Sequence, residues 1–481
     1  MKKKIFLLSL CLGSFLMAAE SKVYENLSLS DAIAMTKEHN LEIDIANFDK
    51  RVNDLGVQVA NGYSFGKLDA TLMGLRSNDA GNVFGFKLQS REANFGDFGF
   101  DQFLGAFGGA MVDSTGVPNF NAFAQNLSNP QAQAQLLGIE PDQLNFPKAR
   151  NHFDEKLSFM IPLYTGWKLK SYRDIAKQMS KMGALNKDKV IAEKLFEVKK
   201  TFYDISLLLH FEKDLKHIAK SMKELRNTTM EMRKEGYAKK SDLLEVESKV
   251  ANIKRMLIQT DANKALSYQF LSFLVNAEVK SIQTVALDAP EFTVTVKDAL
   301  DSNLDIKKAK TGLKIQSKMV DVAKSAFHPQ VGAFAEYGSS DDKFLNDFAK
   351  HDRYTVGVQL SYNLFSGGSD AAKLEQEKLK KLKVARQVEL AKKGIALKFQ
   401  KIKTEIKNFN AQVESLQKEV ELSNEIYLSY LSRYEEGLSS INDVLIKEAL
   451  QIEKLLKLQQ IQTQRNEKIL ELARLTYGEK R

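Results

Sequence analysis

Residues 354–364 read Tyr-Thr-Val-Gly-Val-Gln-Leu-Ser-Tyr-Asn-Leu, and this stretch decides the class of fold. Large apolar side chains alternate with small or polar ones over all 11 residues, which is the period of a β-strand with two different faces. A tilted strand that crosses a lipid bilayer needs about 9–11 residues. The stretch therefore predicts a membrane strand, and a soluble amphipathic hairpin is the alternative.

A long helix is predicted after this strand. Apolar residues recur at alternating spacings of four and three, which is the heptad pattern of a coiled-coil seam. They are Ile395, Phe399, Ile402, Ile406, Phe409, Val413, Leu416 and Val420. The first half of the chain has the same pattern at Ile191, Leu195, Val198, Phe202, Ile205 and Leu209. No proline occurs between Pro162 and Pro290 or after Pro329, so each such helix is free to fold back as a long hairpin.

These elements belong to an internal duplication. Asn40-Leu41-Glu42-Ile43 resembles Asn303-Leu304-Asp305-Ile306, 263 positions later. Glu235-Gly236 with Asp242-Leu243-Leu244 resembles Glu436-Gly437 with Asp443-Val444-Leu445, 201 positions later. The change of offset places 62 extra residues in the first copy, between the regions of Gly74 and Leu157.

Each copy is predicted to contain one short helix, two extended segments and a long helical hairpin. The short helices are expected at 29–62 and 296–326, and the remaining extended segments at 67–75, 157–163 and 331–339. The predicted domains are a signal peptide at 1–19, a first repeat at 20–285 and a second repeat at 286–481. Gly236 and Gly437 are expected to cap the descending helices at the hairpin tips.

Residues 76–150 form a long loop between the two extended segments of the first copy. They contain nine of the 26 glycines and ten of the 29 phenylalanines. Loops on the outer side of membrane barrels are the ones that grow long. The aromatic content argues against full disorder, and the sequence leaves open whether the loop covers a channel mouth or adds strands.

The N-terminus predicts export from the cytoplasm. Lys2, Lys3 and Lys4 precede an apolar run at 5–16 and the small residues Ala18 and Ala19, as in a secretory signal peptide. The apolar run is too short to span a bilayer, and no later stretch is long enough. Cys11, the only cysteine, lies inside this run, so lipidation there is a weak alternative and a thiolate metal site is not expected.

Charge and motifs exclude several functions. The net charge is +9, but Lys and Arg are interleaved with Glu along the predicted helices, which indicates a solvated face and no nucleic-acid surface. No catalytic motif is present, so neither an enzyme nor a cofactor is predicted. His210 and His217 share one helix face but lack a third ligand, and no metal site is predicted. Trp167 is placed either in an interfacial aromatic belt or in packing at the strand end.

The predicted strand number requires several copies of the chain. Four strands cannot close a barrel, and an open sheet edge is not tolerated in lipid. Two copies would give eight strands and an interior filled by side chains, whereas three would give twelve and a lumen. The expected fold is thus a mixed α and β membrane protein, a trimeric β-barrel continuous with a long α-helical tunnel.

Three duplicated motifs resemble those of the TolC-type outer-membrane efflux proteins, in the same order along nearly the whole mature chain. They are the Asp-Ala-Ile/Leu…Asn-Leu-x-Ile opening, the strand-end Leu-Tyr/Phe-Thr/Ser-Gly at 163–166 and 364–367, and the tip Glu-Gly-x5-Asp-Leu/Val-Leu. The resemblance implies a homotrimer in the bacterial outer membrane with a large periplasmic part. It also implies docking to a periplasmic adaptor and an inner-membrane pump, or to a type I secretion exporter.

The resemblance also implies an entrance at the hairpin tips. Asp443 matches the first of two acidic residues that ring the closed entrance in this family, whereas Ile446 occupies the second position. Tyr434 matches a tyrosine that latches the entrance to a neighbouring tip aspartate, here Asp242, and Ser439 replaces an expected arginine. Helix capping by both aspartates is the simpler interpretation. An exported coiled-coil structural protein or adhesin without a channel is the alternative function.

Overall fold

The computed structural model describes residues 23–477, so the predicted signal peptide at 1–19 and Cys11 lie outside the described residues. The chain divides into two compact units. The strand unit comprises Gly56–Ala176 and Ser317–Lys378. The helical unit comprises the chain up to Leu55, Lys177–Gln316 and the chain from Leu379 onward. Each unit thus combines segments from both halves of the sequence.

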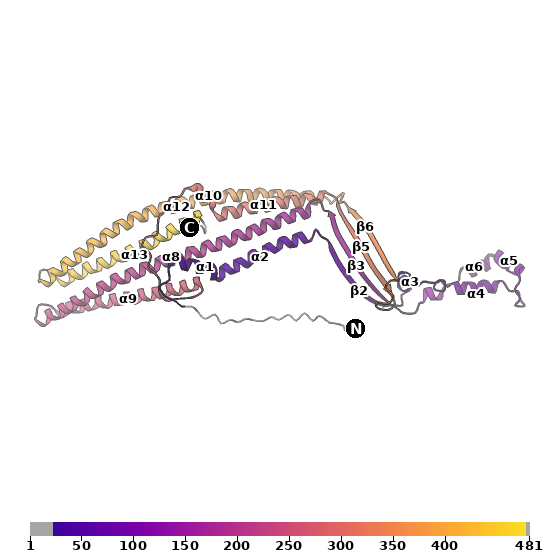
Figure 1. The fold of residues 1–481 in the computed structure, drawn as a ribbon, viewed down its shortest axis with the longest axis horizontal. Coiled ribbons are helices and arrows are strands. Elements are labelled where there is room, and N and C mark those ends of the chain that lie inside the picture. Colours follow the sequence, from indigo (N-terminus) through magenta and orange to yellow (C-terminus); the bar gives the residue numbers. More distant parts are fainter. Residues whose placement is uncertain (1–22, 478–481) are drawn as a thin grey trace. The chain divides into compact units, whose positions relative to one another are not determined.

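One four-stranded antiparallel sheet forms the strand unit, in the order β2-β3-β5-β6 (Figure 1). The strands are β2 (Lys67–Ser77), β3 (Arg150–Tyr164), β5 (Gln330–Asp341) and β6 (Asp352–Ser361). All four predicted extended segments are therefore strands, although β6 ends before Tyr362 and Leu364. Since β3 pairs with β5, the two halves of the sequence join into a single sheet.

The connection between β2 and β3 is mainly helical. Its elements are α3 (Ala80–Gln89), η1 (Phe95–Phe98), α4 (Phe100–Ala110), α5 (Phe120–Ser128), α6 (Pro130–Leu137) and α7 (Asp142–Asn145). No further named strand lies in this part of the described chain, so the option of extra strands was wrong. Side chains cap α3, η1, α5 and α6, as when Asp79 accepts a hydrogen bond from the Asn82 backbone amide at 3.0 Å.

Two long helical hairpins dominate the helical unit (Figure 1). The first is α8 (Lys168–Lys234) with α9 (Lys240–Val275), and the second is α12 (Ser369–Glu435) with α13 (Ile441–Tyr477). Both α8 and α12 contain 67 residues. Burial of Phe202, Ile205, Phe399 and Ile402 confirms the predicted heptad seams. Burial of these large side chains is the main stabilising term for helices of this length.

The two expected short helices are each split in two, which corrects the prediction of continuous helices at 29–62 and 296–326. The observed elements are α1 (Leu29–His39), α2 (Leu41–Gly62), α10 (Val296–Ser302) and α11 (Leu304–Lys324), followed by η2 (Ser325–Phe327). Asn40 and Asn303 stand at the two breaks with ψ angles of 122° and 127°, which are not helical. Hydrophobic periodicity continued through both positions and therefore concealed the breaks.

Each of these asparagines starts a helix and ties it to a hairpin. The Asn40 Oδ1 atom accepts from the amides of Glu42 and Ile43 at 3.0 and 3.2 Å. Its Nδ2 atom donates to the Leu274 carbonyl at 2.8 Å, near the end of α9. Asn303 repeats the arrangement with the amides of Asp305 and Ile306, at 3.0 and 3.1 Å. Its Nδ2 atom donates to the Leu475 carbonyl at 3.2 Å, near the end of α13.

Smaller elements close the helical unit around the hairpins. β1 (Val23–Tyr24) pairs in parallel with β4 (Glu278–Val279). Ala32 of α1 packs in one core cluster with Phe202 and Leu274 of the first hairpin. Ala299 of α10 packs in another with Phe399 and Leu475 of the second hairpin. The two copies therefore build equivalent cores.

None of the helices in the described part of the chain combines the length and the apolar character needed to span a membrane.

Candidate functional site

One face of the four-stranded sheet is apolar and exposed. In the register of β5 and β6, Ala335 lies opposite Val356 and Ala333 lies opposite Val358. Val356 and Val358 are 72% and 68% exposed, although a soluble protein normally buries such a row. The same face continues on β3 and β2 with Leu157, Phe159, Leu68 and Leu72.

The opposite face of the sheet is mainly polar, with Phe334, Met160 and Met73 as apolar members. Thr355, Gly357 and Gln359 alternate with the apolar residues of β6 and therefore point to the other side. On this side the Ser158 hydroxyl donates to the Glu336 carboxylate at 3.4 Å. One apolar and one polar face are what a strand needs when lipid lies on one side and water on the other.

Both edges of the sheet lack a partner within the described chain, because the order places β2 and β6 at its two ends. An edge strand presents a row of free backbone donors and acceptors. Lipid cannot satisfy these groups, so an edge exposed to the bilayer must find a partner strand.

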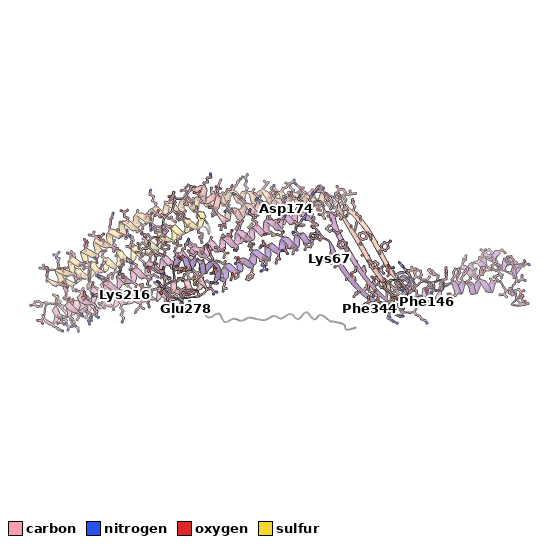
Figure 2. The ribbon with its side chains drawn as sticks, viewed as in Figure 1. Lys67, Phe146, Asp174, Lys216, Glu278 and Phe344 are labelled. Carbon is pink, nitrogen blue, oxygen red and sulfur yellow. The ribbon has the colours of Figure 1, made fainter. Side chains whose placement is uncertain are left out.

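Trp167 lies at the junction between β3 and α8, in the strand unit. Its ring contacts Tyr164 and His328 edge-on, with centroids 5.4 and 5.3 Å away, and 55% of its surface is exposed. Figure 2 shows Lys67 at this end of the sheet and Phe344 at the other. The contacts establish packing at the junction, and a place in an interfacial aromatic belt stays a prediction.

The hairpin tips have nearly the same backbone geometry. Gly236 and Gly437 have φ values of +83° and +72°, which glycine adopts without steric cost. The amide after each glycine, that of Tyr237 or Leu438, donates back into the helix over 2.7 Å. This pattern is a Schellman cap and confirms the predicted capping role of both glycines.

Asp242 and Asp443 cap the helices that ascend from the tips. Asp242 accepts from the Lys239 amide at 2.9 Å. Asp443 accepts from the Ser440 amide at 3.3 Å and from the Ser440 hydroxyl at 2.7 Å, and its own amide donates to that hydroxyl at 3.2 Å. Only the second tip therefore has the reciprocal capping box with a serine hydroxyl.

The cap stabilises the ionised form of Asp443. The Ser440 hydroxyl and amide donate to its carboxylate and hold the pKa below its ordinary value. Asp443 is thus ionised at neutral pH while its side chain remains open to solvent. A capping role does not prevent this carboxylate from acting on ions in water.

Tyr434 is buried near the tip and joins the two hairpins. It is 5% exposed, and its hydroxyl lies 3.2 Å from the Thr229 hydroxyl of α8. Burial raises the pKa of Tyr434, so the phenol stays protonated. Within the single chain, this hydroxyl binds Thr229, and the Asp242 carboxylate binds its own cap. A contact of Tyr434 with the Asp242 of another copy stays a prediction.

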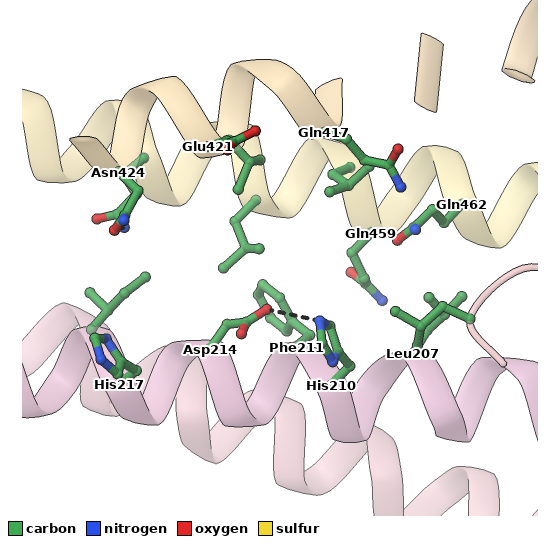
Figure 3. Close-up of a pocket in the computed structure, with 16 residues that line it drawn as sticks. Leu207, His210, Phe211, Asp214, His217, Gln417, Glu421, Asn424, Gln459 and Gln462 are labelled. Carbon is green, nitrogen blue, oxygen red and sulfur yellow. Dashed lines mark hydrogen bonds and ion pairs between the residues drawn. The ribbon is translucent and has the colours of Figure 1, made fainter. Parts of the chain in front are cut away.

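A cavity of about 500 Å³ lies between the two hairpins (Figure 3). His210, Asp214 and His217 line it from α8, and the His210 Nε2 atom lies 3.6 Å from an Asp214 oxygen. Burial raises the pKa of the Asp214 carboxyl. The facing wall combines the apolar side chains of Val420, Leu455 and Leu458 with amides and one carboxylate, from Gln417, Glu421, Asn424, Gln451, Gln459 and Gln462. The hairpins therefore enclose a cavity whose lining mixes polar and apolar side chains.

Glu448 is a buried charge that the sequence gave no reason to single out. It is 1% exposed on α13, and its Oε1 atom has no hydrogen-bond partner. Burial raises its pKa to about 7, against the weaker opposing effect of Lys249. In the sequence it looks like any other glutamate of a solvated helix face. The nearby core cluster, which includes Met222, Val246, Tyr427 and Val444, draws on all four hairpin helices.

Part of the chain matches one protein family. Residues 295–476 match the family described as "Outer membrane efflux protein". No protein with a curated function matches the chain.

Three solved structures of outer-membrane proteins resemble the chain. The outer membrane protein VceC of Vibrio cholerae is 13% identical with a TM-score of 0.71, covering 94% of this chain and 96% of its own. The Campylobacter jejuni CmeC outer membrane channel is 15% identical with a TM-score of 0.72, at coverages of 94% and 86%. The open state of the Neisseria gonorrhoeae MtrE outer membrane channel is 15% identical with a TM-score of 0.72, and the match covers 94% of this chain and 89% of that channel. The chain thus has the fold of these outer-membrane proteins over nearly its whole length.

Proposed function

Since residues 295–476 match the outer membrane efflux protein family, a family of channels and not of enzymes, we propose that three copies of this chain form an outer-membrane exit duct. The duct serves a tripartite efflux system or a type I secretion system. It passes small toxic compounds or polypeptides from the periplasm to the exterior.

The observation that carries this proposal is the four-stranded sheet with one exposed apolar face and two unpaired edges. In a closed ring of copies, β6 of one copy pairs with β2 of the next, and no edge remains. Three copies supply twelve strands, which is wide enough for a water-filled lumen lined by the polar face. Trp167 then lies at a membrane boundary, where an amphipathic ring is favoured.

We place the periplasmic entrance at the hairpin tips. Three Asp443 carboxylates, held ionised by their caps, would form an acidic ring that attracts cations. Tyr434 and Asp242 would contribute contacts between neighbouring copies at the same level. Ile446, 53% exposed, stands where the family has a second acid, so the entrance has one acidic ring.

The partners are a periplasmic adaptor and an inner-membrane pump. Tyr237 and Leu438 occupy equivalent positions in the two tips and are 81% and 65% exposed. These exposed apolar side chains at both tips of every copy offer a docking surface for a partner protein with a complementary apolar surface.

The membrane assignment is tested by two neighbouring substitutions in β6. Val358→Arg puts a charge on the apolar face and should cost roughly 2–4 kcal/mol per copy if that face meets the bilayer midplane. Gln359→Arg, on the polar face, should assemble normally. Heat-modifiable migration of the trimer in gels measures both. Equal assembly of the two variants would contradict a membrane-facing sheet and favour a soluble coiled-coil protein.

The entrance assignment is tested by Asp443→Asn, which keeps the cap acceptor and removes the charge. Single channels in planar bilayers should lose block by multivalent cations, whereas Asp242→Asn should change it less. Block and conductance equal to those of the wild type would remove Asp443 from the entrance.

A further inference from the structure

Three potential metal ligands meet at the end of the sheet that carries residues 76–150, the insertion between β2 and β3. Glu92 lies between α3 and η1, Asp341 ends β5, and His351 immediately precedes β6. One ligand atom from each lies within 4.8 Å of the other two. The three residues come from separate segments, and the fold brings them together.

The orientation of His351 leaves one ring nitrogen facing a carboxylate. Its Nδ1 atom is hydrogen bonded to the Ser90 carbonyl, which must accept, so this nitrogen carries a proton. Its Nε2 atom lies 3.7 Å from the Asp341 Oδ2 atom, too far for a hydrogen bond. In the neutral imidazole this places a nitrogen lone pair opposite an anionic oxygen, an arrangement that a cation between them would stabilise.

The separation suits a shared metal ion. With metal–nitrogen and metal–oxygen bonds of about 2.0–2.2 Å in a tetrahedral site, the two donors would stand roughly 3.4 Å apart. The observed 3.7 Å requires a movement of a few tenths of an ångström. The hydrogen bond from Nδ1 to a backbone carbonyl is also the usual way in which a metal-binding histidine is oriented.

Asp341 is held in place before any ion binds. Its side chain is 3% exposed, and the Asn346 amide donates to its Oδ2 atom at 3.0 Å. The Asp342 backbone amide donates to Oδ1 at 2.6 Å. His351 has 13% of its side chain exposed. Two of the three donors are thus positioned and largely removed from water, unlike scattered surface acids.

Arg150 opposes a cation at this place. Its guanidinium is paired with the Glu92 Oε2 atom and donates to the Ser90 hydroxyl at 3.1 Å. The pair leaves the second Glu92 oxygen free to coordinate, but the positive charge lowers the affinity. Replacing Arg150 by an uncharged residue should therefore strengthen cation binding at this site.

We propose that Glu92, Asp341 and His351 bind one divalent transition-metal ion of the zinc type per chain, with water completing the coordination. One imidazole and two carboxylates are donors that suit Zn²⁺. The bound ion would connect the β2–β3 insertion to the turn between β5 and β6. It would thereby fasten the insertion to the end of the sheet.

Calorimetric titration of chelator-treated, full-length channel with zinc chloride tests the proposal. The wild type should bind about one Zn²⁺ per chain, whereas His351→Ala and Asp341→Asn should each weaken binding by about tenfold or more. His210→Ala is the matched control, because His210 also faces a carboxylate at 3.6 Å but belongs to no such group of three in the described chain. Cobalt absorption would report the coordination directly.

Arg150→Gln separates a metal site from a purely structural cluster. It should bind Zn²⁺ more tightly than the wild type, an effect that general loosening of the fold would not give. Heat-modifiable migration identifies variants that fold. The proposal is overturned if the wild type binds no Zn²⁺, or if folded His351→Ala and Asp341→Asn bind it as the wild type does. Neither result bears on whether the chain forms a channel.

Discussion

The two helical hairpins share one backbone plan but differ in how they hold a glutamate. At equivalent positions in the second helix of each hairpin, α9 has Glu247 and α13 has Glu448. Glu247 lies near the surface and accepts from Arg226 at 2.8 Å. Glu448 is buried, and its Oε1 atom has no partner. The two hairpins therefore share their backbone geometry, but only the second has a buried glutamate whose ionisation lowers the stability of the fold.

The comparison also shows what the two copies retain. Asn40 and Asn303 make the same three kinds of hydrogen bond, and Gly236 and Gly437 end their helices in the same cap. These contacts are local and hold the backbone. The differences lie in side chains that face the other hairpin, where each copy meets a different surface.

The largest expected effect is that of Glu448→Gln. In the folded chain the pKa of Glu448 is about 7, above the ordinary value of 4.5. The folded state thus holds its proton more tightly than the unfolded state does. Stability should fall as the pH rises from about 4.5 to about 7 and stay low above it, a loss of roughly 3 kcal/mol. Glu448→Gln should abolish this slope and raise the melting temperature at pH 8.

Thermal unfolding followed by circular dichroism between pH 5 and 8 measures that slope. Glu247→Gln is the matched control and should leave the slope unchanged, because Glu247 is paired near the surface. Identical pH profiles for the two variants would break the contrast between the hairpins.

The second effect should be equal in the two copies. Asn40→Ala and Asn303→Ala each remove a helix cap and a buried hydrogen bond to a hairpin end, at a cost of about 2 kcal/mol. Denaturant or thermal unfolding of the two variants would give the two costs. If only one of the two substitutions lowered the free energy of unfolding, the asparagine would stabilise the fold in only one of the two copies.

The smallest effect is expected at the tips. Ser440→Ala removes a hydroxyl cap and should cost about 1 kcal/mol, whereas Lys239→Ala, at the equivalent position, should cost less. Hydrogen exchange of the first turns of α9 and α13 resolves the two tips. A larger rise in exchange in α9 of Lys239→Ala than in α13 of Ser440→Ala, each relative to the wild type, would reverse the expected order.

The sequence predicted the long elements well because their signals repeat many times. The heptads around Phe202 and Phe399 and the alternation from Tyr354 to Leu360 each sum over several turns or residues. Competing local preferences cannot outweigh such sums. The register of β3 against β5 was not visible, since pairing between distant strands depends on the assembled sheet.

Single-residue signals were missed although they were present. Asn40 and Asn303 each precede an acidic residue by two positions, a helix-start signal that the continuous apolar pattern concealed. Asn129-Pro130 marks the start of α6 in the same way inside the insertion. The glycine and phenylalanine content of residues 76–150 led to the prediction of a loop. Composition does not record where a helix-start residue stands, so it could not locate these helices.

Other features follow only from the folded chain. Nothing near Glu448 in the sequence distinguishes it from the exposed glutamates of the same helices. Its burial arises where α8, α9, α12 and α13 pack together. Glu92, Asp341 and His351 likewise become neighbours only when the insertion meets the end of the sheet.

The equal length of α8 and α12 restricts how this protein can change in evolution. Inserting one residue into either arm would shift everything beyond it by about 1.5 Å and turn it by about 100°. The contact between Tyr434 and Thr229 would then lose its alignment. Insertions and deletions should survive only in matched pairs of whole heptads, so the reach of the hairpins can change only in steps of about 10 Å.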